Sequence, residues 1–246
     1  MSRPDDGGLA RAAGQVLRLA RCPMLASRSV LHAAPGRATE RVEIDGQLVA
    51  VKWRDDRRDD REALLYRGLS PAVLQALGAP RPLGAGRIGE THLLFLEWVE
   101  GVPADWGDPG HVRRAFGHLG RVHATTAARL ARAEGLIATA EAWAELRPEP
   151  AGTDARGPEP LVLDPGDLHA DNFLLRPDGG VCLLDFENMR VRERARALRQ
   201  LRDDGAMPQG ALANAALTAY WEAAGWAGDV AAFQRRLLAD APLRGR

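Results

Sequence analysis

The stretch from Leu161 to Glu187, LVLDPGDLHADNFLLRPDGGVCLLDFE, constrains the fold of this chain more than any other. An apolar run ends there in a polar loop that carries Asp167 and Asn172. Two short apolar segments follow, joined by Pro-Asp-Gly-Gly at 177–180, which is a strong signal for a β-hairpin. The second segment leads into Asp185. Pairing of the two strands would therefore bring Asp185 back beside Asp167 and Asn172.

These three side chains suit metal-assisted phosphoryl transfer. The reaction needs a carboxylate to orient and deprotonate an attacking hydroxyl, and hard oxygen ligands for the Mg²⁺ that neutralises the phosphates. The spacing Asp167-x4-Asn172 is that of a kinase catalytic loop, and Asp185 opens an Asp-Phe-Glu triplet where a kinase has D-F-G. The spacing alone is also compatible with an Asx-rich loop before an ordinary hairpin. Its register with the triplet favours the kinase interpretation.

In these residues the chain resembles the aminoglycoside phosphotransferase and choline kinase family of small-molecule kinases, whose motifs are H-G-D-x-x-x-x-N and I-D-F-E. The resemblance runs from about residue 27 to residue 205. It implies an α+β, bilobal protein-kinase-like fold with an antiparallel-sheet N-lobe and a mostly helical C-lobe. Residues 1–101 would bind the nucleotide, with a hinge at 96–101, and residues 102–246 would carry catalysis and acceptor binding. The implied cofactors are ATP, or GTP, and Mg²⁺.

The same resemblance assigns roles to the loop. Asp167 would be the catalytic base, and Asn172 and Asp185 would hold Mg²⁺. Two departures from the family pattern stand against this. Pro165 replaces the first histidine of H-G-D, which usually braces the backbone of the metal site. The G-D-x-x-x-D-L that follows D-F-E in the family, and helps to shape its acceptor site, is absent.

Lys52 is the only lysine among 33 basic residues. It lies in the strand-like segment 48–53, where a kinase has its phosphate-binding lysine. A compact ammonium and a guanidinium are not interchangeable at a tight phosphate site, so a chain that otherwise uses arginine has reason to keep a lysine here. The alternative is a leftover lysine on an edge strand.

Glu62 lies in a predicted helix over residues 59–69. In the family pattern it would pair with Lys52 and hold that side chain against the α- and β-phosphates. A competing interpretation makes Glu62 one more solvated charge in the run RDDRRDDRE, where Asp59 and Asp60 are near alternatives for the pairing.

A predicted strand at 91–96 runs into a segment that resembles the hinge between kinase lobes. Adenine would hydrogen-bond there to the backbone of about residues 96–99, which makes Glu97, Trp98 and Val99 the candidate nucleotide-binding residues. A loop at 33–39 falls where a nucleotide-covering turn would be, but it contains a single glycine.

Residues 84–89, Gly-Ala-Gly-Arg-Ile-Gly, formally match the dinucleotide-binding fingerprint G-x-G-x-x-G. That fingerprint must follow a strand and open a helix. Here Pro80 and Pro82 precede the match and a strand-like segment follows it. We therefore interpret it as a hairpin turn between the fourth and fifth strands.

His123 ends Leu-Gly-Arg-Val-His, which resembles the L-x-x-L-H helix of the family, and we expect it to be a hydrogen-bonded core histidine. The arginine-rich run at 188–204 is interpreted as a solvated helix face, with an anionic substrate or nucleic acid as alternatives. It also slightly resembles sugar kinases that act on the lipopolysaccharide core. Helices are expected over 8–21, 109–134, 137–146, 211–224 and 229–238.

Composition narrows the function further. The formal net charge is zero, so no global field favours nucleic acid or an anionic membrane. No apolar run approaches the roughly 18 residues of a membrane-spanning helix. Cys22 and Cys182 stand too far apart to indicate a disulfide framework or a zinc site. These features predict a cytoplasmic protein without a nucleic-acid or membrane partner, and they leave its oligomeric state open.

The sequence thus predicts an ATP-dependent O-phosphotransferase acting on a hydroxyl of a small molecule, such as an aminoglycoside or other antibiotic, an amino alcohol or a sugar. The absence of an A-P-E signature and the glycine before Asp167 argue against a protein kinase. Pro165 motivates an alternative, a catalytically weak pseudokinase that acts as a nucleotide-binding module. An RNA-binding protein that uses the arginine-rich run is a third interpretation.

Overall fold

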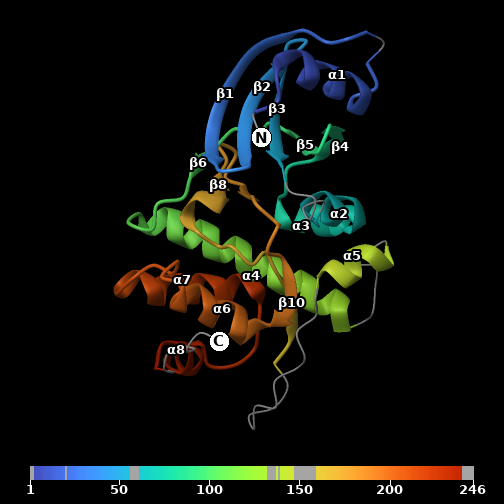
Figure 1. The fold of residues 1–246 in the computed structure, drawn as a ribbon. Coiled ribbons are helices and arrows are strands. Elements are labelled where there is room, and N and C mark those ends of the chain that lie inside the picture. Colours follow the sequence, from blue (N-terminus) through green and yellow to red (C-terminus); the bar gives the residue numbers. More distant parts are fainter. Residues whose placement is uncertain are drawn as a thin grey trace. The chain divides into compact units, whose positions relative to one another are not determined.

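The computed structural model describes residues 3–19, 21–55, 61–131, 137, 139–146 and 159–239 of the chain. The chain divides into two units (Figure 1). The first is Met1–Arg67 with Pro80–Val99, and the second is Gly68–Ala79 with Glu100–Arg246. The lobe limits of 1–101 and 102–246 stay a prediction.

The strands of the first unit form an antiparallel sheet in the order β1-β2-β3-β5-β4. Their bounds are Leu25–Ala34 (β1), Arg37–Ile44 (β2), Gln47–Arg54 (β3), Pro82–Ile88 (β4) and Thr91–Glu97 (β5). Asp45 and Gly46 turn β2 into β3 with φ angles of 48° and 79°, and a type I′ hairpin turn requires positive φ at both positions. Buried residues alternate along β2 and β3, so one face of the sheet carries the core. Helix α1 (Asp6–Val16) packs Leu9 and Ala13 into that core.

The predicted loop at 33–39 is wrong. β1 continues to Ala34 and β2 begins at Arg37, because the two strands stay paired up to the turn, with Ala34 opposite Arg37. Only Pro35 and Gly36 remain to reverse the chain, and Gly36 takes a φ of 72°.

The interpretation of residues 84–89 as a hairpin turn is also only partly right, because Gly84 to Ile88 lie within β4 and Gly89 begins the turn. Helix α1 contacts this strand. A Cβ atom on Gly84, whose φ is 150°, would lie 2.5 Å from Cγ1 of Val16, and one on Gly86 would lie 3.1 Å from its Cγ2. The glycines therefore make room for a helix, not for a dinucleotide.

Helix α1 is also shorter than the predicted range of 8–21. Arg18 takes a left-handed φ of 54°, and the Leu19 amide turns back to the carbonyl oxygen of Gly14. The chain thus leaves the helix before it reaches Cys22 and Pro23. The predicted helix at 59–69 is α2 (Arg61–Gly68) in the described residues.

The second unit is mostly helical. Its helices are α3 (Pro71–Leu77), α4 (Pro109–Ala131), α5 (Ala140–Glu145), α6 (Arg194–Asp203), α7 (Ala211–Ala224) and α8 (Val230–Ala239). Its short strands pair as β6-β8-β9, which are Val102–Pro103, Phe173–Leu175 and Val181–Leu183, and as β7 with β10, which are Leu161–Asp164 and Arg190–Glu193. Helices and antiparallel sheets together confirm the predicted α+β class.

Helix α4 packs against α7 and β7, and Figure 1 shows α4 running the length of this unit. Helices α4 and α7 come close together at Gly120, where a Cβ atom would lie 2.1 Å from the carbonyl oxygen of Tyr220. His123 is fully buried, and its Nδ1 lies 2.7 Å from the hydroxyl of Tyr220. The expected hydrogen-bonded core histidine is confirmed.

The predicted solvated helix over 188–204 is wrong in its first half. Residues 190–193 form β10, which pairs antiparallel with β7 and places Arg192 opposite Val162. Arg192 is 1% exposed and Arg194 7% exposed. A short strand with alternating arginines is typical of a solvent-exposed strand. Here it pairs with β7, the strand that leads into the polar loop.

The predicted helix at 137–146 begins only at Ala140, because Ile137 forms an isolated bridge with Leu69. The end of the predicted helix at 109–134 lies outside the described residues beyond Ala131. Within the described ranges, no helix is long and apolar enough to cross a membrane.

Candidate active site

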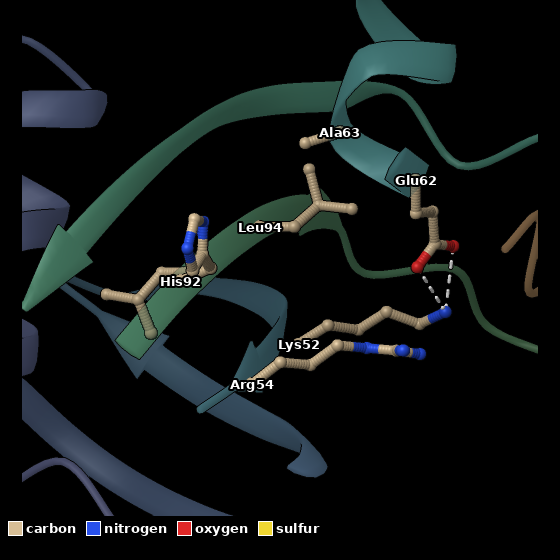
Figure 2. Close-up of a pocket in the computed structure, with 7 residues that line it drawn as sticks. Lys52, Arg54, Glu62, Ala63, His92 and Leu94 are labelled. Carbon is tan, nitrogen blue, oxygen red and sulfur yellow. Dashed lines mark hydrogen bonds and ion pairs between the residues drawn. The ribbon is translucent and has the colours of Figure 1, made fainter. Parts of the chain in front are cut away.

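Lys52 and Glu62 form an ion pair in the first unit. The Nζ atom of Lys52 lies 2.8 and 2.9 Å from the two carboxylate oxygens of Glu62, and Figure 2 shows the two side chains reaching toward each other. Lys52 comes from β3 and Glu62 from the first turn of α2. Their side chains are 16% and 8% exposed, so Glu62 is not a solvated charge. Asp59 and Asp60, the alternative partners, lie outside the described residues.

The alternation of β3 explains where Lys52 points. Val51 and Trp53 face the core under α1, so Lys52 emerges on the opposite face of the sheet. A pocket of about 340 Å³ lies there, lined by Lys52, Arg54, Glu62, Ala63, His92, Leu93 and Leu94. Arg54 emerges on the same face two residues later and runs alongside Lys52 (Figure 2). The pocket thus combines two cationic side chains with the Glu62 carboxylate that pairs with Lys52.

The candidate hinge residues lie at the end of β5. The backbone amide of Glu97 donates to the carbonyl oxygen of Arg81, and the Glu97 carboxylate accepts from the Arg81 amide at 2.9 Å. The side chain and amide of Glu97 are therefore engaged within the protein. The guanidinium of Arg41 lies 5.4 Å from the ring centre of Trp98, and both Trp98 and Val99 are partly exposed.

In the second unit, the predicted hairpin brings Asn172 and Asp185 together. Phe173 pairs with Leu183 across β8 and β9, and the amide of Leu184 donates to the carbonyl oxygen of Asn172 at 2.9 Å. Asn172 ends a short 3-10 helix, Ala170–Asn172. Its side-chain nitrogen donates to the backbone oxygen of Asp167 at 2.8 Å. The loop therefore closes on itself between Asp167 and Asn172.

Asp185 holds an uncommon backbone conformation, with a φ of 60°. The left-handed region costs a non-glycine residue about 1–3 kcal/mol unless its surroundings impose it, and such residues gather at functional sites. The Asp185 carboxylate accepts a hydrogen bond of 3.4 Å from the amide of Glu187, and the next side chain, Phe186, is fully buried. The buried phenylalanine anchors the segment while Asp185 stays partly exposed.

The carboxylate of Asp167 lies 3.0 Å from Nε2 of His169, and the two side chains are 31% and 58% exposed. A pocket of about 270 Å³ opens beside Asp167. Its lining comes from the loop and from α6 with the residues after it: Asp164, Gly166, Asp167, Leu168, His169, Ala197, Gln200, Leu201, Asp204 and Ala206. It thus combines a candidate base with further hydrogen-bonding groups.

Sequence reasoning missed Gln200 and the pairing of His169 with Asp167. The spacing of Gln200 and Asp204 by four residues places both on one side of a helix, which was a usable signal. The arginine-rich run obscures this signal, because its first half forms β10 and α6 begins only at Arg194. The predicted residues thus lie in both units: Lys52 pairs with Glu62 in the first. In the second, Asn172 bonds to the backbone of Asp167 and pairs through its own backbone with Leu184, the residue before Asp185.

No protein-family model matches this chain, and no curated protein matches its sequence. Solved structures do match. A macrolide 2′-phosphotransferase from Brachybacterium faecium has a TM-score of 0.59 at 17% identity, covering 96% of this chain and 89% of that one. A spectinomycin phosphotransferase in complex with ADP and spectinomycin has a TM-score of 0.57 at 10% identity, covering 92% and 84%.

An ethanolamine kinase from Plasmodium vivax also matches, with a TM-score of 0.53 at 12% identity, covering 87% of this chain and 70% of that one. At these identities the likeness is one of fold. It confirms the bilobal protein-kinase-like fold, in the form found in small-molecule phosphotransferases, that the sequence motifs predicted.

Proposed function

We propose that the chain is an O-phosphotransferase that uses a magnesium-bound nucleoside triphosphate, ATP or GTP, to phosphorylate a hydroxyl of a small molecule. The observation that carries the proposal is the loop of the second unit, where the Asn172 side chain bonds to the backbone of Asp167 and the hairpin pairs the residue before Asp185 with Asn172. The Lys52–Glu62 ion pair supports it from the first unit.

The residues of the loop fit a magnesium ion. The Asn172 amide nitrogen is engaged by Asp167, so its oxygen is the atom left for a metal, and Asp185 contributes a carboxylate. No group of three or more His, Cys, Asp or Glu side chains that could hold a metal occurs in the described ranges. Mg²⁺ in nucleotide sites is commonly bound by one or two protein ligands and completed by phosphates and water. When bound, it would neutralise charge on the phosphates.

Each remaining residue then has a physical role. Asp167 orients the acceptor hydroxyl and accepts its proton, and its carboxylate is partly exposed and therefore reachable. Lys52, positioned by Glu62, contacts the α- and β-phosphates. The Glu97 amide already donates to the carbonyl oxygen of Arg81. Adenine would therefore hydrogen-bond to the other backbone groups of residues 97–99.

The pocket beside Asp167 is the candidate acceptor site. Gln200, Asp204 and His169 line it with both donors and acceptors of hydrogen bonds, which suits a hydroxylated acceptor. Spectinomycin, macrolides and ethanolamine, the acceptors named for the matching structures, all carry hydroxyl groups. Antibiotics, amino alcohols and sugars are therefore the classes to test.

The second candidate is a nucleotide-binding module without useful turnover. Pro165 favours it, because the proline lacks the side chain with which the family histidine braces the backbone of the metal site. Binding of a magnesium-nucleotide without transfer to any acceptor would distinguish this module from an enzyme.

The experiment is a screen of hydroxylated antibiotics, amino alcohols and sugars with Mg-ATP and Mg-GTP, scored by mass spectrometry for the gain of one phosphate. A true product must depend on Asp167 and disappear with Asp167→Asn. The matched control is Asp178→Asn, which changes an exposed carboxylate in the hairpin turn of the same loop region. Nucleotide binding with no product across the panel would overturn the enzyme proposal.

A further inference from the structure

Arg192 is the bulkiest of the fully buried side chains in the described residues, at 1% exposure. Burying a guanidinium costs several kcal/mol unless charge pairing and hydrogen bonds offset it. A buried arginine on a four-residue strand therefore needs a structural reason. Its location supplies one, because β10 pairs with β7, the strand that leads directly into the loop of Asp167.

The contacts of Arg192 connect two elements of the site. Its Nη1 atom lies 3.4 Å from Oδ2 of Asp164, and the Asp164 side chain is 3% exposed. The same nitrogen donates a hydrogen bond to Oε1 of Gln200 on α6. Asp164 is the last residue of β7, and Gln200 lines the pocket beside Asp167. Arg192 thus ties the end of the strand to the helix that forms the other wall of that pocket.

Asp164 in turn holds the start of the loop. Its Oδ1 atom accepts a hydrogen bond of 3.2 Å from the amide of Gly166, the residue before Asp167. Pro165 has no amide hydrogen to contribute. Gly166 takes a φ of 88°, and a Cβ atom there would lie 2.1 Å from the carbonyl oxygen of Asn188. The loop therefore passes close to the backbone that follows Asp185, and the Asp164 carboxylate holds it in that position.

We infer that Arg192 is a positioning residue for the catalytic loop. With Gln200 it orients the Asp164 carboxylate, which fixes Gly166 and so the direction in which Asp167 leaves the strand. This cluster, the buried Asp164 and Arg192 with the partly exposed Gln200, stabilises the loop in a chain that has Pro165 in place of the histidine of the H-G-D motif. The effect on catalysis rests on the proposed function, whereas the effect on loop order does not.

The test separates positioning from stability with a double variant, Arg192→Met with Asp164→Leu. Replacing both members of a buried ion pair with apolar groups of similar size is often neutral or stabilising, so the variant should fold. Its Gly166 amide loses its acceptor. We expect amide hydrogen exchange of residues 166–172 to accelerate at least about tenfold while α4 keeps its protection. Turnover should fall about ten- to hundredfold at unchanged nucleotide KM.

The matched control is Arg194→Met with Glu159→Leu. Arg194 is two residues away, is similarly buried, and forms an ion pair of 2.7 Å with Glu159. This pair shares the β10–α6 segment, but the Arg194 guanidinium bonds to Glu159 and packs over the rings of Trp221, Trp226 and Phe233. Loop exchange and turnover should stay at the native level in this variant, whatever happens to its melting temperature.

A folded Arg192→Met, Asp164→Leu variant with native loop exchange would overturn the inference. Faster loop exchange confined to this variant supports it, and a parallel fall in turnover extends it to catalysis. If the native chain transfers phosphate to nothing, the proposed function fails but the exchange result still decides the inference. If the double variant does not fold, the single variant Arg192→Lys provides the test. It keeps the positive charge but loses the planar guanidinium that reaches two partners, so amide exchange of the loop should rise severalfold. Unchanged exchange in this variant would overturn the inference.

Discussion

The side-chain nitrogen of Asn172 donates a hydrogen bond of 2.8 Å to the backbone oxygen of Asp167. This bond occupies the nitrogen of the Asn172 side-chain amide within the protein and leaves the amide oxygen as the atom that could bind a metal. It also ties the side chain of the candidate metal ligand to the backbone of the candidate base. Preorganisation of this kind is what a reaction that depends on positioning and electrostatics requires.

Asp167→Asn should lower turnover by at least about 10², because the amide cannot accept the acceptor proton. The substitution is isosteric, and nucleotide affinity should change little. Steady-state kinetics with the acceptor found in the screen, together with a nucleotide titration, measure both quantities. Native turnover in this variant would show that Asp167 is not the base.

Asp185→Asn should raise the Mg²⁺ concentration needed for half-maximal turnover, since a neutral amide is a weaker ligand than a carboxylate. Asparagine is also among the residues that tolerate the left-handed φ of 60°, so the melting temperature should stay close to native. Turnover is measured across a Mg²⁺ series. An unchanged Mg²⁺ dependence would make Asp185 a structural residue.

Lys52→Arg should raise the nucleotide KM at least about tenfold, a loss of roughly 1.4 kcal/mol, because the larger, planar guanidinium does not fit the geometry of the ammonium. Lys52→Met should in addition lower the free energy of unfolding by about 3 kcal/mol, because it leaves the Glu62 carboxylate, 8% exposed, without its ion pair. Adding Glu62→Gln should restore much of that stability without restoring nucleotide binding. Urea titrations of the single and double variants provide the comparison, and equal stability of the two would refute the coupling.

The stability of the chain should fall between about pH 4.5 and pH 2 through Glu40, which is fully buried. Burial opposes its ionisation, but hydrogen bonds from Arg28, Arg3 and Trp53 outweigh burial and lower the pKa to about 2. A carboxylate with a lowered native pKa contributes stability above its unfolded pKa and loses it as pH falls through the native one. Glu40→Gln should therefore unfold more easily at neutral pH, by about 2–3 kcal/mol, and lose this acid dependence. Denaturation at a series of pH values tests this prediction, with Glu43→Gln on the same strand as the control. An unchanged acid dependence of stability in Glu40→Gln would contradict it.

Gly84→Ala should destabilise the fold by more than about 1 kcal/mol, because the new methyl group would meet Val16 at 2.5 Å and the φ of 150° disfavours a side chain. The companion change Val16→Ala should recover the steric part of the loss. Gly179→Ala, at a φ of 86° with open space around it, is the control for backbone strain alone. Thermal unfolding of the three variants measures the difference, and equal losses at Gly84 and Gly179 would mean that α1 does not press on β4.

Local signals in the chain were sufficient for much of this architecture. Pro-Asp-Gly-Gly and Asp45-Gly46 demand tight turns whatever surrounds them, so the two hairpins, and with them the return of Asp185 to Asn172, could be predicted from the residues alone. The expected ranges of α7 and α8 match the structure closely for the same reason, because a helix of that length shows its period in the sequence.

Other features depended on segments distant in the sequence. Gly84 pairs with Phe95 of β5 and has no room for a side chain because helix α1, almost seventy residues earlier, packs on its strand. Glu62 is the partner of Lys52 because α2 turns it toward β3. Arg192 has the composition of a solvated surface and became buried only because β10 pairs with β7 and α6 supplies Gln200. An ion pair between two elements that are distant in the sequence produces no periodic pattern from which it could be predicted. The chemistry of the loop could therefore be predicted from the sequence. The side chains that hold the loop in place could be identified only from the tertiary structure, in which distant strands and helices pack together.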